Sequence, residues 1–177
     1  MKAKNYFILI LLLNFCLPQV ALPQSVVKEP TDVLEQIHWI IERSDVHTVK
    51  KKFQEFCEKN NFPSVVSSLK DGTYRGATPY DDYGYSHVVV FEMKKGKMIS
   101  IDYDEVHRDG HAKQSDDAYG KQMMQSGTSP SIAYPKYEKA MIGSQNFNDM
   151  DAVSGATYSL FRFRLAILYA IHSSKRG

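Results

Sequence analysis

The stretch "SHVVVFEMKKGKMISIDYD", residues 86–104, decides the fold. Residues 86–93 and 98–104 are rich in β-branched, aromatic and other apolar side chains, and the "KKGK" between them is typical of a turn. The second run alternates strictly, with Ile99, Ile101 and Tyr103 set against Ser100, Asp102 and Asp104. Because successive strand residues point to opposite faces, this pattern predicts an antiparallel hairpin with one face on the core and one in water.

The residues before the hairpin extend this prediction. "DGTYRGA", residues 71–77, predicts an edge strand that begins at a turn. Residues 31–60 predict two amphipathic helices: Val33, Leu34, Ile37, Ile40 and Ile41 after a cap at Thr31, then Val46, Val49, Phe53, Phe56 and Cys57 after a cap at Ser44 or Asp45. Each apolar stripe needs a surface, so we expect the helices to pack on the main domain; a partner-binding role is the alternative.

Helical patterns return after the hairpin. Residues 115–126, "SDDAYGKQMMQS", predict a helix capped by Ser115, and residues 134–143, "YPKYEKAMIG", predict one with Pro135 early and Gly143 at its end. Residues 157–172 are apolar on nearly every side after Arg164, as expected of a central buried helix. The predicted class is therefore α+β, with helices packed against one antiparallel sheet and an N-terminal helical extension.

The first residues resemble a secretory signal peptide. Lys2 and Lys4 precede an apolar run of about 12 residues, which is shorter than the ~20 of a spanning helix. We therefore divide the chain into a signal peptide (1–24), a helical N-terminal extension (25–69) and a main domain (70–177), and expect export. Cys16 is a candidate for lipid attachment, although the bulky Phe15 precedes it where small residues are usual.

Charge and cysteine content narrow the function. Removal of residues 1–24 takes away Lys2 and Lys4 and leaves 20 basic against 20 acidic residues, so the processed chain is formally neutral. A neutral surface without a basic stripe argues against nucleic acid as a partner. Processing also leaves one cysteine, Cys57, which excludes an internal disulfide and is expected to pack as a small apolar residue.

The segment "DAVSGATYS", residues 151–159, is the best candidate for chemistry. It places Ser154, Gly155, Ala156 and Thr157 at the start of the predicted final helix, where free backbone N–H groups favour a phosphate. Small residues let a phosphate ester approach the backbone, and Thr157 offers a hydroxyl beside it. The alternative is that Ser154 or Thr157 is simply the N-cap of the helix.

"DAVSGAT" resembles the flavinylation motif of the FMN-binding domain family. That family includes subunits of sodium-pumping and related membrane oxidoreductases and small exported electron-transfer flavoproteins. The segment "DGTYRGATPYDDYGYSHVVVFEMKKGKMISIDYDEVHRDG", residues 71–110, looks like the sheet segment of the exported members. The resemblance spans about residues 70–172 and implies that Thr157 carries FMN through a phosphoester bond.

The resemblance also implies roles for neighbouring residues. Asp151 would orient Thr157 or hold a metal during attachment, Ser154, Gly155 and Ala156 would shape the phosphate site, and Ser159 would donate to the phosphate. For the edge of the flavin ring our candidates are Tyr103, Asp104 and Glu105, with Tyr83 or Tyr85 as stacking rings. Tyrosines on strands are, alternatively, half-buried packing residues.

Partners follow from the same resemblance. A separate FAD-dependent, magnesium-using flavin transferase would attach the cofactor, and the protein would carry electrons between a membrane donor and an extracytoplasmic acceptor. It would be an electron-transfer flavoprotein rather than a stand-alone catalyst. The competing hypothesis is an exported binding or interaction module with loosely bound or no flavin.

Other chemistries fit the sequence less well. "DYDEVHRDG", residues 102–110, has Val106 at a calcium-ligand position, and Ser154 lacks the preceding glycine of a nucleophile elbow. A haem-attachment C-x-x-C-H motif is absent from the sequence. No zinc site is predicted either, because the histidines form no close pair on a predicted helix; they are His38, His47, His87, His107, His111 and His172.

Overall fold

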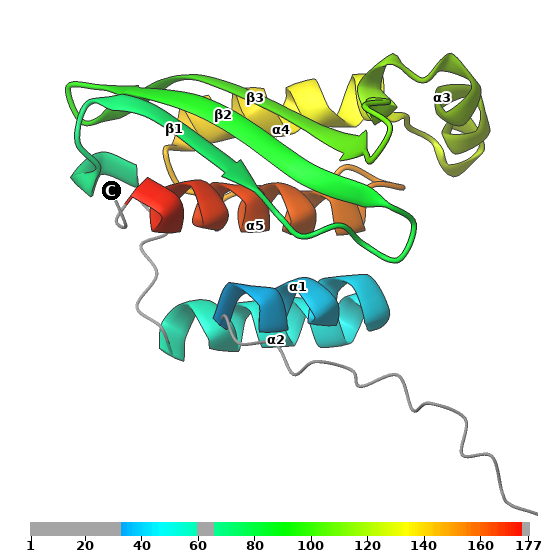
Figure 1. The fold of residues 1–177 in the computed structure, drawn as a ribbon, viewed down its shortest axis with the longest axis horizontal. Helices are drawn as coiled ribbons and strands as arrows, with labels where there is room; N and C mark the ends of the chain where they lie inside the picture. Colours follow the sequence, from blue (N-terminus) through cyan, green and yellow to red (C-terminus); the bar gives the residue numbers. More distant parts are fainter. Residues whose placement is uncertain (1–32, 60–65, 175–177) are drawn as a thin grey trace, which may run out of the picture.

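A computed structural model describes residues 33–59 and 66–174 (Figure 1). It confirms the predicted α+β class. None of the helices in these two ranges is long and apolar enough to cross a membrane. The predicted signal peptide, Cys16 and the Thr31 cap lie outside the described residues. In chain order the elements are α1 (Val33–Arg43), α2 (Val46–Lys59), η1 (Val66–Ser68), β1 (Gly72–Ala77), β2 (Tyr85–Lys94), β3 (Lys97–His107), η2 (Lys113–Ser115), α3 (Asp117–Met123), η3 (Met124–Ser126), α4 (Pro130–Ser144) and α5 (Thr157–Ser174).

The three strands form one antiparallel sheet in the order β1-β2-β3. The turn between β2 and β3 places Lys95 at φ 53° and Gly96 at φ 70°. Left-handed conformations at both central residues match the right-handed twist of the flanking strands, which is why "KKGK" closes the hairpin so tightly. The predicted hairpin and edge strand are both confirmed.

One residue of the predicted alternation is wrong. The pairing of β2 with β3 shifts between Glu92 and Met93, since Glu92 lies opposite Ser100 and Met93 lies opposite Met98. Ile99 is the extra residue of this bulge and is 46 % exposed, whereas Met98 and Ile101 are buried. A bulge inverts the alternation locally, so the core receives Met98 in place of Ile99.

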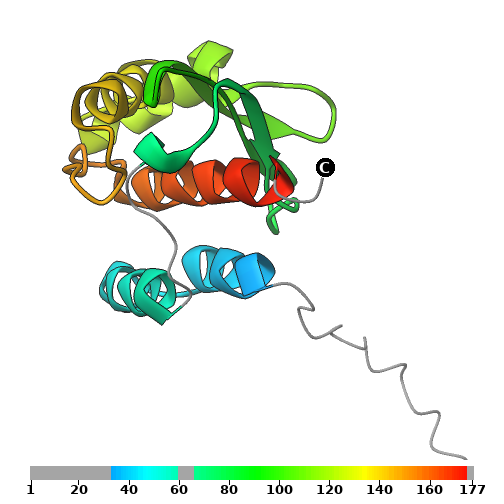
Figure 2. The ribbon, with the colours of Figure 1, turned by 90° about the vertical axis from the view of Figure 1, so that its left-hand side faces the viewer.

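Helix α5 is the centre of the fold. It lies against the face of β1 and β2, while α4 lies along β3 (Figures 1 and 2). The approach of β1 is close: a Cβ added at Gly76 would lie 2.4 Å from the Ala166 carbonyl oxygen and 2.4 Å from the Ala170 amide nitrogen. Small residues at these three positions bring strand and helix into contact, and the central buried helix is confirmed.

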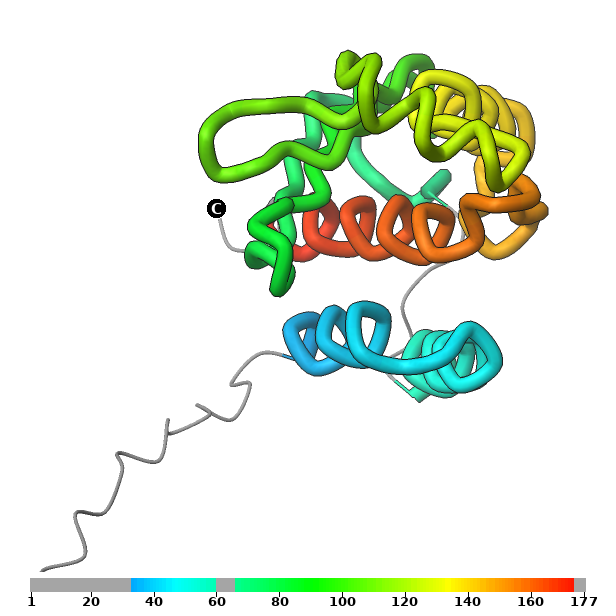
Figure 3. The backbone as a smooth tube through the Cα atoms, turned by 90° about the vertical axis from the view of Figure 1, so that its right-hand side faces the viewer, coloured from blue at the N-terminus to red at the C-terminus, as the bar shows by residue number. Residues whose placement is uncertain are grey.

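Helices α1 and α2 form a third layer on the other side of α5 (Figures 1 and 3). Asp45 caps α2, since its Oδ1 accepts from the His47 and Thr48 amides at 3.0 Å each. The buried stripes contain Leu34, Ile37, His38 and Ile41 on α1 and Val49, Phe53 and Cys57 on α2. The two helices therefore pack on the main domain, as expected.

Helix ends between the sheet and α5 differ from the predictions. Asp116, and not Ser115, caps α3, because its side chain accepts from the Tyr119 amide at 2.9 Å. Helix α4 begins earlier than predicted, with Pro130 in its first turn, where a missing N–H costs nothing. It ends past Gly143, at a left-handed Gln145 with φ 58°.

Candidate functional site

The hydroxyl of Tyr137 fixes the loop that leads into α5. The Tyr137 hydroxyl donates to the Ala156 carbonyl at 2.8 Å and accepts from the Val153 amide at 3.1 Å. The Ala156 amide in turn donates to the Val153 carbonyl at 2.9 Å. Tyr137 is buried on α4, so the helix before the motif fixes the turn through residues 153–156.

The backbone conformation and the close packing at position 155 require glycine. Its φ is +80°, in the left-handed region, and an added Cβ would lie 2.3 Å from the Ser126 carbonyl oxygen. Both the backbone conformation and the close approach of the 124–126 segment require glycine. The motif glycine thus shapes the turn while Ser154 stays exposed.

Helix α5 starts without a hydroxyl cap. The Ala156 carbonyl accepts the first helical bond, from the Leu160 amide at 3.2 Å, so Ala156 occupies the N-cap position and Thr157 is the first helical residue. Alanine offers no side-chain acceptor to the N–H groups of the first turn. The alternative that Ser154 or Thr157 is the N-cap is therefore wrong.

Thr157 lies on the wall of a cavity of about 520 Å³, here called the α5 pocket. That volume is in the range of small-molecule sites. Asp151 and Thr157 both line it, so the structure brings the first and last residues of the motif to one space. The lining residues come from α2, the 148–152 loop and α5: Lys50, Phe53, Gln54, Cys57, Glu58, Asn148, Met150, Asp151, Ala152, Thr157, Leu160, Phe161 and Arg164.

Two lining residues, Arg164 and Cys57, define the chemistry of the pocket wall. Arg164 Nη2 donates to the Met150 carbonyl at 2.9 Å, which ties the loop to α5. Burial lowers the pKa of Arg164 below its ordinary value, yet a guanidinium stays charged at neutral pH. Burial also raises the pKa of Cys57 to about 11, so it is an inert thiol, and its predicted packing role is confirmed.

The predicted ring contacts lie elsewhere. Tyr103 and Glu105 are fully buried, and the Tyr103 ring packs edge-on against those of Tyr134 and Phe163. Asp104 is half-buried and accepts from the Gln114 amide at 3.1 Å. None of Tyr103, Asp104 and Glu105 lines the α5 pocket.

The remaining candidates also lie outside the α5 pocket. Ser159 is half-buried and lies against the Tyr134 phenol. Tyr83 is 79 % exposed, and the Tyr85 ring lies 4.1 Å from Lys113 Nζ. Of the residues assigned to the flavin, Asp151 and Thr157 therefore meet at the pocket, with Ser154, Gly155 and Ala156 forming the turn between them.

A second constellation was not predicted. Five charged or titratable side chains from α1, the sheet, η2 and α5 meet inside the protein, and we call them the buried ion cluster: Glu42, His87, Glu105, Lys113 and Arg162. Arg162 Nη2 and Nε donate to the two oxygens of Glu42 at 2.6 and 2.9 Å, and its Nη1 donates to Glu105 at 3.3 Å. Lys113 donates to Glu105 at 2.6 Å.

The cations keep both carboxylates ionised. Burial by itself would raise the pKa of Glu42, but hydrogen bonds from His87 and Arg162 lower it to about 2. Burial likewise opposes ionisation of Glu105, and Arg162, His87 and Lys113 hold its pKa well below the ordinary value. In such a cluster each buried carboxylate is compensated by a cation. Removal of either partner leaves an uncompensated buried charge, which destabilises the fold.

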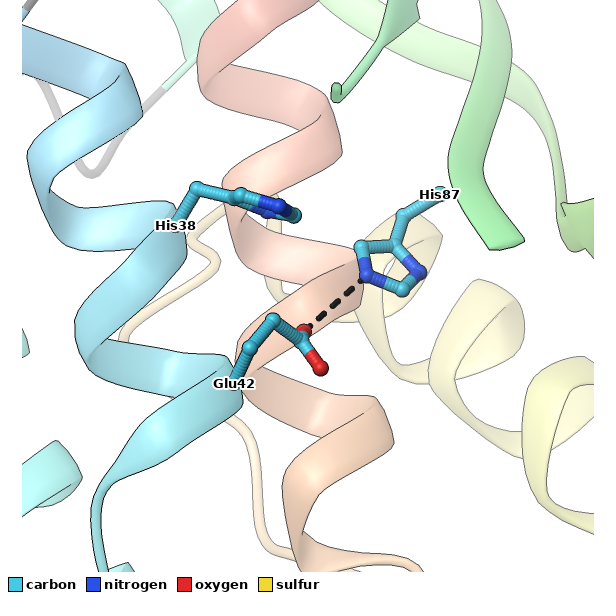
Figure 4. A group of neighbouring side chains, drawn as sticks. All are labelled: His38, Glu42 and His87. Carbon is cyan, nitrogen blue, oxygen red and sulfur yellow. Dashed lines mark hydrogen bonds and ion pairs between the residues drawn. The ribbon is translucent and has the colours of Figure 1, made fainter. Parts of the chain in front are cut away.

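His38 extends this cluster towards α1. The side chains of His38, Glu42 and His87 bring one ligand atom each within 4.8 Å of one another, and His87 Nε2 lies 3.1 Å from Glu42 Oε1 (Figure 4). Sequence patterns do not reveal this group, because residues 38 and 87 belong to different predicted elements. The one local sign of it is a histidine, His38, on the apolar stripe of α1, one turn before Glu42.

The fold and its two constellations define an α+β domain with a pocket at the start of its central helix. No family model matches the chain. The chain is 32 % identical over 113 residues to the 15 kDa lipoprotein of Treponema pallidum, covering 63 % of this chain and 80 % of that protein. It belongs to the same family as that lipoprotein.

A solved structure supports the fold. The crystal structure of the CPE2226 protein from Clostridium perfringens matches with a TM-score of 0.56 and 32 % sequence identity, over 60 % of this chain and 90 % of that one. The two alignments span 63 % and 60 % of this chain, so each leaves more than a third of it unmatched.

Proposed function

We propose that the protein is an exported carrier of FMN, which is attached by a phosphoester bond to Thr157, and that it transfers electrons between a membrane donor and an extracytoplasmic acceptor. The observation that carries this proposal is that Asp151 and Thr157 both line the α5 pocket, within a segment that resembles the flavinylation motif.

The residues present fit a phosphate ester at this place. Thr157 is the first residue of α5, and the N-cap position holds an alanine without a competing acceptor. The helix N-terminus therefore has N–H groups and a positive dipole end to offer to a phosphate. Lys50 and Arg164 add positive charge to the pocket lining.

Attachment requires a nucleophile and a base. Thr157 Oγ would form a bond to the phosphorus of the FMN half of FAD, the pyrophosphate bond would break, AMP would leave, and the hydroxyl proton would pass to a base. Asp151, which is exposed and lines the same pocket, is our candidate for that base. Bound FMN supplies reversible electron uptake, which is chemistry that no amino-acid side chain of this pocket provides.

The proposal also includes export and membrane association. The Treponema pallidum relative is by name a lipoprotein, which agrees with the secretory signal expected in residues 1–24 and with Cys16 as a candidate for lipid attachment. Outside the cytoplasm a covalent bond prevents loss of the flavin by dilution. A FAD-dependent flavin transferase is the partner that attachment requires.

Intact-mass measurement of the processed protein tests the proposal. The protein is prepared with and without an active flavin transferase, and the modified peptide is mapped. We expect a gain of one FMN less one water, on the peptide that contains Thr157, only when the transferase is present.

Two variants sharpen this experiment. Thr157→Val removes the hydroxyl at little change in volume and should abolish the gain, whereas Thr73→Val, a matched change on the exposed side of β1, should retain it. Flavin on Thr157→Val would reject the attachment residue. No gain in the wild type, with the transferase active on another substrate, would favour a binding or interaction module with loosely bound or no flavin.

A further inference from the structure

We propose that His38, Glu42 and His87 form a binding site for a divalent transition metal, with Zn²⁺ as the probe. The three residues, here called the histidine site, join the N-terminal helical layer to the sheet. His38 and Glu42 come from α1, and His87 comes from β2 (Figure 4). This site is separate from the α5 pocket, because none of its residues lines that cavity.

The geometry is close to that of a coordinated ion. A tetrahedral zinc site with bonds of about 2.0–2.1 Å places neighbouring ligand atoms about 3.3 Å apart. His87 Nε2 and Glu42 Oε1 are already 3.1 Å apart, and all three ligand atoms lie within 4.8 Å. The centroid of the His38 ring lies 5.9 Å from that of the His87 ring, and a shift of about 1.5 Å or less in the His38 ring completes the set.

The unpaired nitrogens of His38 are the strongest sign that this site takes a ligand. His38 is fully buried, yet neither of its ring nitrogens bonds to any described group. Buried polar atoms are almost always paired, and leaving one unpaired costs stability. A metal ion would satisfy one of these nitrogens in the direction of Glu42 and His87.

A carboxylate behind the His87 ring would orient it as a metal ligand. His87 Nδ1 is buried, has no hydrogen-bond partner among the described residues, and lies 3.9 Å from Glu105 Oε2. A metal on Nε2 would replace the proton shared with Glu42 and leave Nδ1 protonated and directed at Glu105. A carboxylate behind a metal-binding histidine orients the ring and raises its basicity.

The buried ion cluster would hold the carboxylates in place. Arg162 bonds both oxygens of Glu42, and Lys113 and Arg162 together hold Glu105. Two histidines and one carboxylate form a ligand set that suits zinc and other divalent first-row metals, and three protein ligands leave an open coordination position. Bound metal would clamp α1 to β2 and so stabilise the packing of the helical layer.

The test uses the whole processed chain, stripped of metal with a chelator and dialysed. Zinc uptake is measured by calorimetry and metal analysis, and the unfolding temperature is measured with and without zinc. We expect one zinc per chain and a rise of about 10 °C at a free zinc concentration of about 100 times Kd. Cobalt substitution should give visible d–d absorption from the same site.

Matched variants separate this site from adventitious surface binding. His38→Phe should lower zinc affinity at least about 100-fold and remove the zinc-dependent rise, while its metal-free unfolding temperature equals or exceeds that of the wild type, because no partner is lost. His47→Phe, on the exposed face of α2, should bind zinc like the wild type.

Several results would overturn the proposal. They are a wild-type chain that takes up no stoichiometric zinc, unchanged zinc binding by His38→Phe, and loss of binding by His47→Phe instead. If His38→Phe does not fold, His38→Gln replaces it, and zinc binding by that variant at wild-type affinity likewise rejects the site.

Discussion

The α5 pocket and the histidine site differ in how they are built. The pocket is open, and its two motif residues, Asp151 and Thr157, are six positions apart in sequence. The histidine site is closed, and its ligands are 49 residues apart, from His38 to His87. An open site needs a local motif, whereas a buried polar site needs partners from several elements to offset desolvation.

Substitution of Arg162 should have the largest effect on stability and should distinguish the buried ion cluster from the α5 pocket. Arg162→Met leaves Glu42 and Glu105 without their shared cation and should lower the free energy of unfolding by about 3–5 kcal/mol. Chemical denaturation measures this change. Lys136→Met, an exposed control on α4, should change stability by less than about 0.5 kcal/mol. Flavin attachment to folded Arg162→Met should persist, and its loss would show that the two regions are coupled.

Acid should destabilise the fold through the histidine site. Burial, and then the nearby His87, lower the pKa of His38 to about 4 from an ordinary 6.5, so the unfolded chain binds a proton first. The free energy of unfolding therefore has its full value above about pH 6.5. It should fall by up to about 3 kcal/mol as the pH drops from there through 4. Glu42, whose pKa is about 2 in the fold, adds a loss only below about pH 4.5.

Denaturation with chelator present, repeated at several pH values, tests this assignment. His38→Phe should remove the loss between pH 6.5 and 4.5 and keep the loss at lower pH. An unchanged profile in the variant would assign the titration to another group.

Gly155 tests the shape of the pocket loop. Gly155→Ala adds a Cβ 2.3 Å from the Ser126 carbonyl oxygen at a left-handed φ, and should cost about 2–4 kcal/mol. Gly127→Ala is the matched control, because Gly127 also has a left-handed φ, of +90°, but no described atom within 4 Å of the added Cβ. It should cost only about 1–2 kcal/mol. Equal losses in thermal unfolding would assign the whole effect to φ.

Tyr137 should give the smallest effect. Tyr137→Phe removes a donor to Ala156 and an acceptor for Val153, at a cost of about 1–2 kcal/mol. The freed loop should also slow flavin attachment, followed by mass against time. Tyr83→Phe, at a 79 % exposed position, should leave both quantities unchanged. A normal attachment rate in Tyr137→Phe would show that this phenol stabilises the fold only.

Sequence patterns predicted most of the fold because the relevant interactions are local. Period-two alternation around "KKGK" specified the hairpin, and a helix that is apolar on nearly every side after Arg164 specified the centre of the core. The errors arose where a single residue depends on its neighbours in space: the bulge at Ile99, the Asp116 cap and the Gln145 helix end. At each of these places several local conformations have similar energies, and tertiary contacts decide which one forms.

The candidate sites divide in the same way. The sequence by itself determined the motif from Asp151 to Thr157, since a turn and the helix that follows it need contiguous residues. Only the tertiary structure placed Tyr103 and Glu105 inside the core and joined His38, Glu42 and His87. Charge pairing between α1, β2 and α5 depends on how the layers pack, and burial makes that pairing obligatory, which no spacing along the chain encodes.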